Sequence, residues 1–116
     1  MSNNSEAPEP ATHLAYRSLS NGELIFSFPN VLAAIDLYTQ REIAVLGIEV
    51  LTEFEEGYRT EKLSGYSSEH ESGSWGDFVA SRNVLATEFV KDQVRADNLF
   101  LLTTATHLEY ANLRVP

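Results

Sequence analysis

The sequence predicts an α+β fold in which a small, mostly antiparallel or mixed sheet of three to four strands is covered by two amphipathic helices. Two long apolar runs rich in β-branched or large apolar residues, at 43–51 and 99–106, predict buried strands. Apolar residues recur every three or four positions over 31–40 and 75–94, which predicts the helices. With 116 residues, 43% of them apolar, we expect a single domain over residues 13–116 with one continuous core.

The first twelve residues combine Ser, Asn, Glu and Pro with almost no apolar side chains. Such a segment cannot offset the entropy lost on ordering, so we expect a disordered tail at 1–12. It has neither the basic start nor the apolar stretch of a signal peptide, and no apolar run reaches the length of a membrane span. Because the chain also has no cysteine, we expect a soluble protein of the cytoplasm.

The segment 24–28 follows the turn signal Asn21-Gly22 and is short and aromatic. This pattern fits either an edge strand or the apolar lead-in to a helix, and the sequence does not choose between them. Pro29 and Asn30 then supply a proline and a capping residue ahead of the helix over 31–40.

The strand over 43–51 is the most apolar stretch of the chain. Strict alternation would place four side chains on one buried face: Ala44, Leu46, Ile48 and Val50. Gly47 predicts a bulge or the close passage of another element. Gly57 suggests a turn, after which 58–63 returns as an antiparallel partner, followed by an exposed loop or frayed strand over 64–73.

A capping signal at Ser74 and Asp77 starts the clearest helix, which we expect over 75–94. Its spacing predicts seven inward-facing residues: Trp75, Phe78, Val79, Leu85, Ala86, Phe89 and Val90. Trp75 is expected to support the core rather than to contact a ligand. The apolar run 99–106 then forms a second buried strand.

Acidic residues dominate the middle of the chain. The net charge is −9, and residues 49–77 alone hold eight acids against Arg59 and Lys62, a formal −6. This charge argues against nucleic acid as a partner and suits a basic protein. Aromatic rings interleaved with the acids are typical of a protein-binding surface, although a solvated loop with some rings in the core remains the alternative. The candidate binding residues are Glu49, Glu53, Glu55, Glu56, Tyr58, Glu61, Tyr66, Glu69 and Glu71.

Glu69, His70 and Glu71 are the one place where a histidine stands between two carboxylates. Neighbours on an extended chain point to opposite faces, so this spacing suits neither a metal nor acid–base chemistry. The sequence also has no nucleophile elbow and no glycine-rich phosphate loop. We therefore expect no catalytic residues, metal or cofactor. The alternatives are a small enzyme or metal-dependent hydrolase that uses these three residues, and a regulatory subunit of an obligate complex.

One combination of features is distinctive: the strand 43–50, an acidic, tyrosine-bearing hairpin, a helix with the segments 75–79 and 86–90, and a final apolar strand. Over about residues 23–106 this order resembles a family of small bacterial immunity proteins. That family neutralises the toxic domains of polymorphic toxin and contact-dependent growth-inhibition systems. The resemblance implies a cytoplasmic immunity domain that binds the C-terminal domain of a cognate toxin, often a nuclease with a basic groove. We expect no contact with a membrane, because no apolar run is long enough to span one. An acidic surface suits this role because it carries the charge of the nucleic acid that it would displace.

Overall fold

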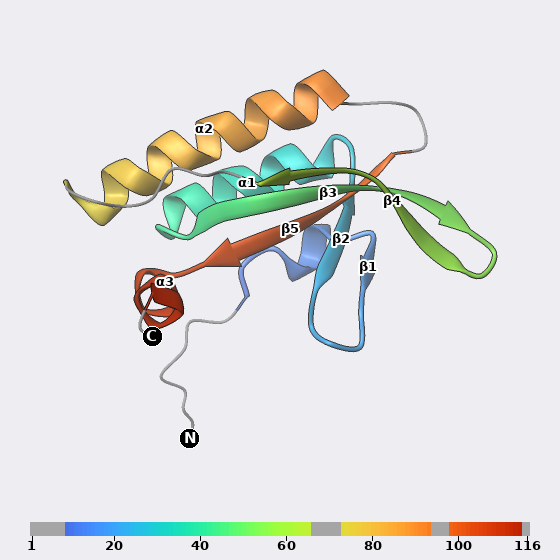
Figure 1. Ribbon diagram of the computed structural model, residues 1–116, viewed down its shortest axis with the longest axis horizontal. Coiled ribbons are helices and arrows are strands. Elements are labelled where there is room, and N and C mark those ends of the chain that lie inside the picture. Colours follow the sequence, from blue (N-terminus) through green and yellow to red (C-terminus); the bar gives the residue numbers. More distant parts are fainter. Residues whose placement is uncertain (1–8, 66–72, 94–97, 115–116) are drawn as a thin grey trace.

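The computed structural model describes residues 9–65, 73–93 and 98–114 (Figure 1). The elements, in chain order, are the 3-10 helix η1 (Thr12–Leu14), β1 (Arg17–Ser18), β2 (Leu24–Ser27), α1 (Asn30–Gln40), β3 (Ala44–Phe54), β4 (Gly57–Gly65), α2 (Trp75–Gln93), β5 (Leu99–Ala105) and α3 (His107–Arg114). The predicted α+β class is confirmed. The described residues form five strands and three α-helices, one strand and one helix more than the upper bounds predicted.

All strands belong to one antiparallel sheet with the order β1-β2-β5-β3-β4. The segment 24–28, for which the sequence allowed either an edge strand or the lead-in to a helix, contains strand β2. This strand lies inside the sheet, between β1 and β5. Helices α1 and α2 lie together over one face of the sheet (Figure 1). The predicted last strand, β5, occupies the centre. None of the helices in the described ranges is long and apolar enough to cross a lipid bilayer.

The main core fills the space between the sheet and helices α1 and α2. Its members include Phe26 and Phe100 from the sheet, Val31, Ile35 and Tyr38 from α1, and Ala86 and Val90 from α2. A second apolar cluster lies apart from this core and contains Ile25, Leu51, Leu99 and Leu101, with Leu19 and Tyr58 packed against it. Apolar residues on both sides of the central strands explain why β5 is almost continuously apolar.

A bulge changes the predicted faces of β3. The pairing of β3 with β5 shifts register between Val45 and Gly47, which confirms the irregularity predicted at Gly47. Because the extra residue shifts the alternation, Val45 joins Ile48 and Val50 in the main core. The prediction that Ala44 and Leu46 share the face of Ile48 and Val50 is wrong, because both pack against Trp75 and Val79 at the start of α2.

Helix α2 begins as predicted, because the backbone N–H of Asp77 donates to Ser74 Oγ at 3.0 Å. Trp75 is buried, with 7% of its surface exposed. The prediction for Leu85 is wrong: 43% of its surface is exposed, whereas Arg82 and Asn83 are buried. Helical spacing does not reveal this, because both polar side chains are buried with bonds to backbone groups of residues 43–46.

Asn83 satisfies backbone groups at the start of β3. Strand β4 pairs with β3 only as far as the Gly47–Gly65 pair, so residues 43–46 have no partner from β4. Asn83 Oδ1 accepts a hydrogen bond from the Val45 N–H at 2.8 Å, and Asn83 Nδ2 donates to the Ile43 carbonyl at 3.0 Å. The side chain thus gives these two buried backbone groups the partners they need, beyond the last described pair of β3 with β4.

Helix α3, which the sequence analysis does not predict, lies beside the start of α2. The rings of Trp75 and His107 stack with their centroids 4.7 Å apart, and Tyr110 lies 5.4 Å from Trp75 and 5.3 Å from Phe78. Trp75 Nε1 donates to the Glu42 carbonyl at 2.7 Å. Trp75 therefore joins α2, α3 and the turn before β3, which agrees with its predicted structural role.

The predicted tail falls partly outside the described residues, which start at Glu9. From there the chain packs on the domain: Ala11 is fully buried in the main core, and Glu9 accepts a hydrogen bond from the Ala11 N–H at 2.9 Å. Burial, with a hydrogen bond to Glu9, raises the pKa of the Tyr38 hydroxyl. The domain therefore includes residues 9–12, which we expected to belong to the tail.

Candidate functional site: the hairpin of strands β3 and β4

The hairpin of β3 and β4 projects beyond the helices at one end of the molecule (Figure 1). A two-residue turn, Glu55 and Glu56, joins the strands, and Gly57 follows it with a φ of 141°. Among the non-glycine residues described, Glu42 alone has a positive φ, so both turn residues lack the positive φ of a type I′ turn. Gly57 therefore takes the unusual backbone angle, which a residue with a side chain rarely adopts.

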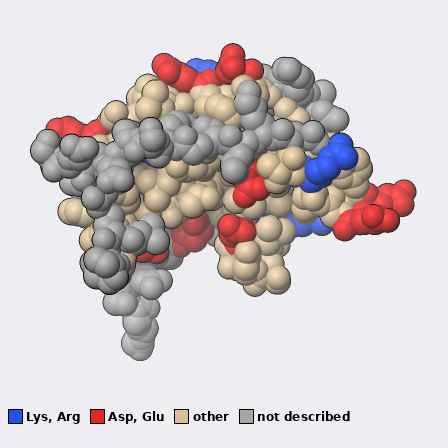
Figure 2. Space-filling model, in the orientation of Figure 1, with Lys and Arg blue, Asp and Glu red and all other residues tan. Residues whose placement is uncertain are grey.

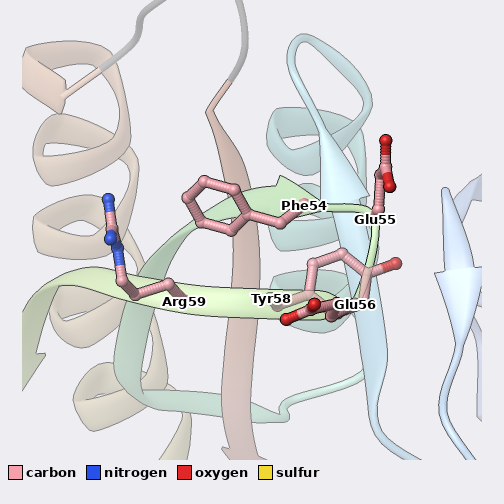
Figure 3. A pocket seen from close by; sticks show the side chains of 6 residues that line it. Phe54, Glu55, Glu56, Tyr58 and Arg59 are labelled. Atoms are coloured by element: carbon pink, nitrogen blue, oxygen red, sulfur yellow. The ribbon is translucent and has the colours of Figure 1, made fainter.

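Glu55 and Glu56 are exposed, and neither carboxylate has a hydrogen bond or ion pair with another described residue. Acidic atoms stand out at the corresponding end of the space-filling view (Figure 2). The two carboxylates point away from each other (Figure 3). The turn therefore offers two separate negative charges to a partner rather than one paired site.

Phe54 and Arg59 form one face of the hairpin. The Phe54 side chain is 46% exposed, and the Arg59 guanidinium carbon lies 4.7 Å from the centroid of its ring. An open hollow lies beside them, lined by residues 54–59 (Figure 3). This face combines an apolar ring with charges of both signs, and an exposed aromatic ring can lose contact with water when a partner binds.

Glu53 lies on the opposite face and is held within the chain. Tyr16 Oη donates to Glu53 Oε1 at 2.6 Å, and Arg17 Nη2 lies 3.6 Å from Glu53 Oε2. The Arg17 guanidinium carbon also lies 5.9 Å from the centroid of the Tyr16 ring and 5.8 Å from that of the Tyr58 ring. The hydrogen bond to Glu53 is the main cause that raises the pKa of Tyr16, because it stabilises the protonated hydroxyl.

Glu49 is also engaged, since it is half-buried and accepts a hydrogen bond from Thr60 Oγ1 at 2.8 Å. The acids of β3 thus differ from those of the turn. Glu49 makes a bond between the two strands of the hairpin, and Glu53 bonds the hairpin to Tyr16 and Arg17, whereas Glu55 and Glu56 face solvent.

The structure brings five of the predicted binding residues together along the hairpin: Glu49, Glu53, Glu55, Glu56 and Tyr58. The backbone of Glu61 lies in β4, opposite a register shift between Val50 and Leu51, and its side chain is outside the described set. Tyr66, Glu69 and Glu71 lie outside the described residues, as does His70.

The predicted binding residues do not include four residues of this region: Tyr16, Arg17, Phe54 and Arg59. The sequence places Phe54 among the rings interleaved with the acids, but not among the candidate residues. Phe54 and Arg59 had a local signal, because the predicted hairpin with its turn near Gly57 places them on neighbouring strands. Tyr16 and Arg17 had none, because they reach Glu53 only through the curl of the sheet.

Two further hollows occur in the described part of the chain. One lies between α1 and α2 and is lined by residues such as Ile35, Val84 and Lys91. The other is mainly polar and is lined by Glu9, Glu23, Glu109 and neighbouring residues. No three His, Asp or Glu residues in the described ranges are grouped as a metal site would require.

Comparison with known proteins adds no relative: no family model, no curated protein and no solved structure matches this chain.

Proposed function

We propose that this chain is a cytoplasmic immunity protein that binds and neutralises the C-terminal domain of a cognate bacterial toxin. The observation that carries the proposal is the projecting turn, where Glu55 and Glu56, which pair with no other described residue, lie next to the exposed ring of Phe54. This combination is suited to binding a basic surface. The resemblance of the sequence to immunity proteins is the reason to propose that this basic surface belongs to a toxin domain.

Charge and apolar surface would act at different stages of binding. A net charge of −9 with acids at a projecting tip attracts a basic domain, and such steering raises association rates roughly ten- to a thousandfold at low ionic strength. Salt screens this attraction over about 10 Å at 0.1 M. Phe54 would lose contact with water in the complex and slow its dissociation. A nuclease domain with a basic groove fits both contributions.

The test uses the toxin domain encoded next to this gene. Reversal of charge in the double variant Glu55→Lys/Glu56→Lys should slow association at low salt by roughly tenfold or more. It should also abolish protection of cells that express the toxin. The control, Glu88→Lys/Asp92→Lys, makes the same change in net charge at exposed positions of α2.

Equal association rates and equal protection for the two double variants would contradict the hairpin as the binding surface. Circular dichroism should confirm that both variants are folded. The genetic context offers a second test: a toxin gene directly upstream is expected, whereas a metabolic operon would contradict the proposal.

A further inference from the structure

We propose that Tyr16, Arg17 and Glu53 form a latch that holds the hairpin tip, residues 52–59, in its binding orientation. Glu53 then acts as a positioning residue rather than as a direct contact with the partner. The part of this inference that concerns binding rests on the proposed function. The part that concerns the hairpin itself does not.

The hairpin tip needs support because the rest of the sheet does not reach it. Pairing between β3 and β5 ends at Leu51 and Leu99, whereas pairing between β3 and β4 continues to Phe54 and Gly57. The tip is therefore a two-stranded ribbon. An isolated two-stranded hairpin is at best marginally stable in water.

The latch connects Glu53 in this two-stranded ribbon to Tyr16 and Arg17, which lie in a distant part of the sheet. Tyr16 directly precedes β1, and its backbone N–H donates to the Ile25 carbonyl of β2 at 2.7 Å. Strands β2 and β5 stand between β1 and β3 in the sheet order. In a flat sheet, three strand spacings would separate β1 from β3 by about 14 Å. The 2.6 Å bond between Tyr16 Oη and Glu53 Oε1 fits a curled sheet, in which the side chains of the two distant strands turn toward each other.

The contacts of the latch differ in strength. The bond from Tyr16 to Glu53 is short and involves a carboxylate, which makes it the strongest single contact of the group. The Arg17–Glu53 pair is longer and partly exposed, so it adds less. Tyr58, which is paired with Glu53 across the hairpin, packs against Leu51 and the rest of the second apolar cluster. Arg17 of the latch therefore lies beside the Tyr58 ring as well as beside the Glu53 carboxylate.

A fixed tip would favour binding because ordering of a mobile loop in the complex costs free energy. Glu55 and Glu56 follow Glu53 by two and three residues, so the orientation of the ribbon determines where their carboxylates lie. Loss of the latch should therefore weaken binding although both acids remain.

Amide hydrogen exchange tests the latch without a partner. In Tyr16→Phe and in Glu53→Ala, the amides of residues 54–60 should exchange about tenfold faster than in the wild type. The double variant should match Glu53→Ala, because that single change already removes the bond from Tyr16. Amides of β5 should remain protected in all three, which shows that the domain is folded. Glu23→Ala is the control, since Glu23 is an exposed acid bonded to Asn21, outside the hairpin.

Unchanged exchange at residues 54–60, or additive effects in the double variant, would overturn the latch. Association with the adjacent toxin domain is then measured for Tyr16→Phe, where a slowing of several-fold is expected. Faster exchange together with wild-type binding would overturn the positioning role. If the wild type binds no toxin domain, the proposed function fails, while the exchange result still decides whether the latch exists.

Discussion

Replacing Asn83 with Ala should destabilise the domain strongly, although the change removes only a small polar side chain. The variant leaves the Val45 N–H and the Ile43 carbonyl without their partner in a buried position. Each buried backbone group that loses its hydrogen bond costs about 1–3 kcal/mol. Asn83 Nδ2 also donates to Thr39 Oγ1 at 2.9 Å, but the loss of this bond matters less, because the Thr39 hydroxyl keeps its own bond to the Ile35 carbonyl. We therefore expect a loss of about 2–6 kcal/mol in the free energy of unfolding.

Urea denaturation measures this loss, with the fluorescence of Trp75 as the probe, because it is the one tryptophan of the chain and is buried. Ser81→Ala is the matched control, since Ser81 is an exposed polar residue on the same helix. It should change stability by less than about 0.5 kcal/mol. A loss below about 1 kcal/mol for Asn83→Ala would show that water or another group can replace the amide. It would refute the idea that Asn83 is needed as the hydrogen-bond partner of Val45 and Ile43.

Three further predictions concern the aromatic residues. Trp75→Ala should reduce the free energy of unfolding by about 3–5 kcal/mol in denaturation followed by circular dichroism; a loss below 1 kcal/mol would contradict its structural role. The Tyr58 hydroxyl is buried without a partner among the described residues, so Tyr58→Phe should keep or raise the melting temperature, and a clear decrease would reveal a missing partner. Tyr16 should lose its proton at higher pH than an ordinary tyrosine, and Glu53→Ala should remove this shift in an ultraviolet titration. Because the folded pKa lies above the unfolded value of 10.0, the stability that this bond contributes is present below pH 10 and is lost as the pH rises through the folded value. Equal titration of Tyr16 with and without Glu53 would contradict the bond.

Local pattern predicts the long elements well. Apolar periodicity predicts helices α1 and α2 and strands β3 and β5, because each buries a regular face. The turn residue Gly57 predicts β4 as the antiparallel partner of β3. Local pattern does not predict strand β1 or helix α3. The first has only two residues, Arg17–Ser18, and the second is a short segment whose packing depends on Trp75, more than thirty positions earlier in the chain.

Errors within the elements have specific causes. The sequence predicts an irregularity at Gly47 but not its effect on the side chains before it. One extra residue in β3 moves Ala44 and Leu46 away from the face of Ile48 and Val50. Asn83 lies inside because its amide bonds to backbone groups at the start of β3, beyond the last described pair of β3 with β4. Neither fact is present in the local sequence, because the first depends on the pairing of β3 with β5 and the second on where the pairing of β3 with β4 ends.

The candidate site shows the same division. The exposure of Glu55 and Glu56 follows from their place in a predicted turn. The engagement of Glu53 depends on Tyr16, thirty-seven positions away, and on the curl of a sheet whose strand order the sequence does not reveal. A count of acids therefore overstates the charge that the hairpin offers, because some of these acids bind within the chain.

The central place of β5 has a consequence for how the chain acquires its structure during synthesis. Strands β2 and β3 do not pair with each other, and each pairs with β5, which begins only at Leu99. Until that strand leaves the ribosome, the growing chain contains two separate sets of strands and two helices without a complete sheet to cover. Pairings between distant segments form slowly, and unpaired apolar strands are prone to aggregate in the meantime. We expect the β3–β4 hairpin to form early, as a local contact, and the insertion of β5 between β2 and β3 to complete the sheet in one late, cooperative step.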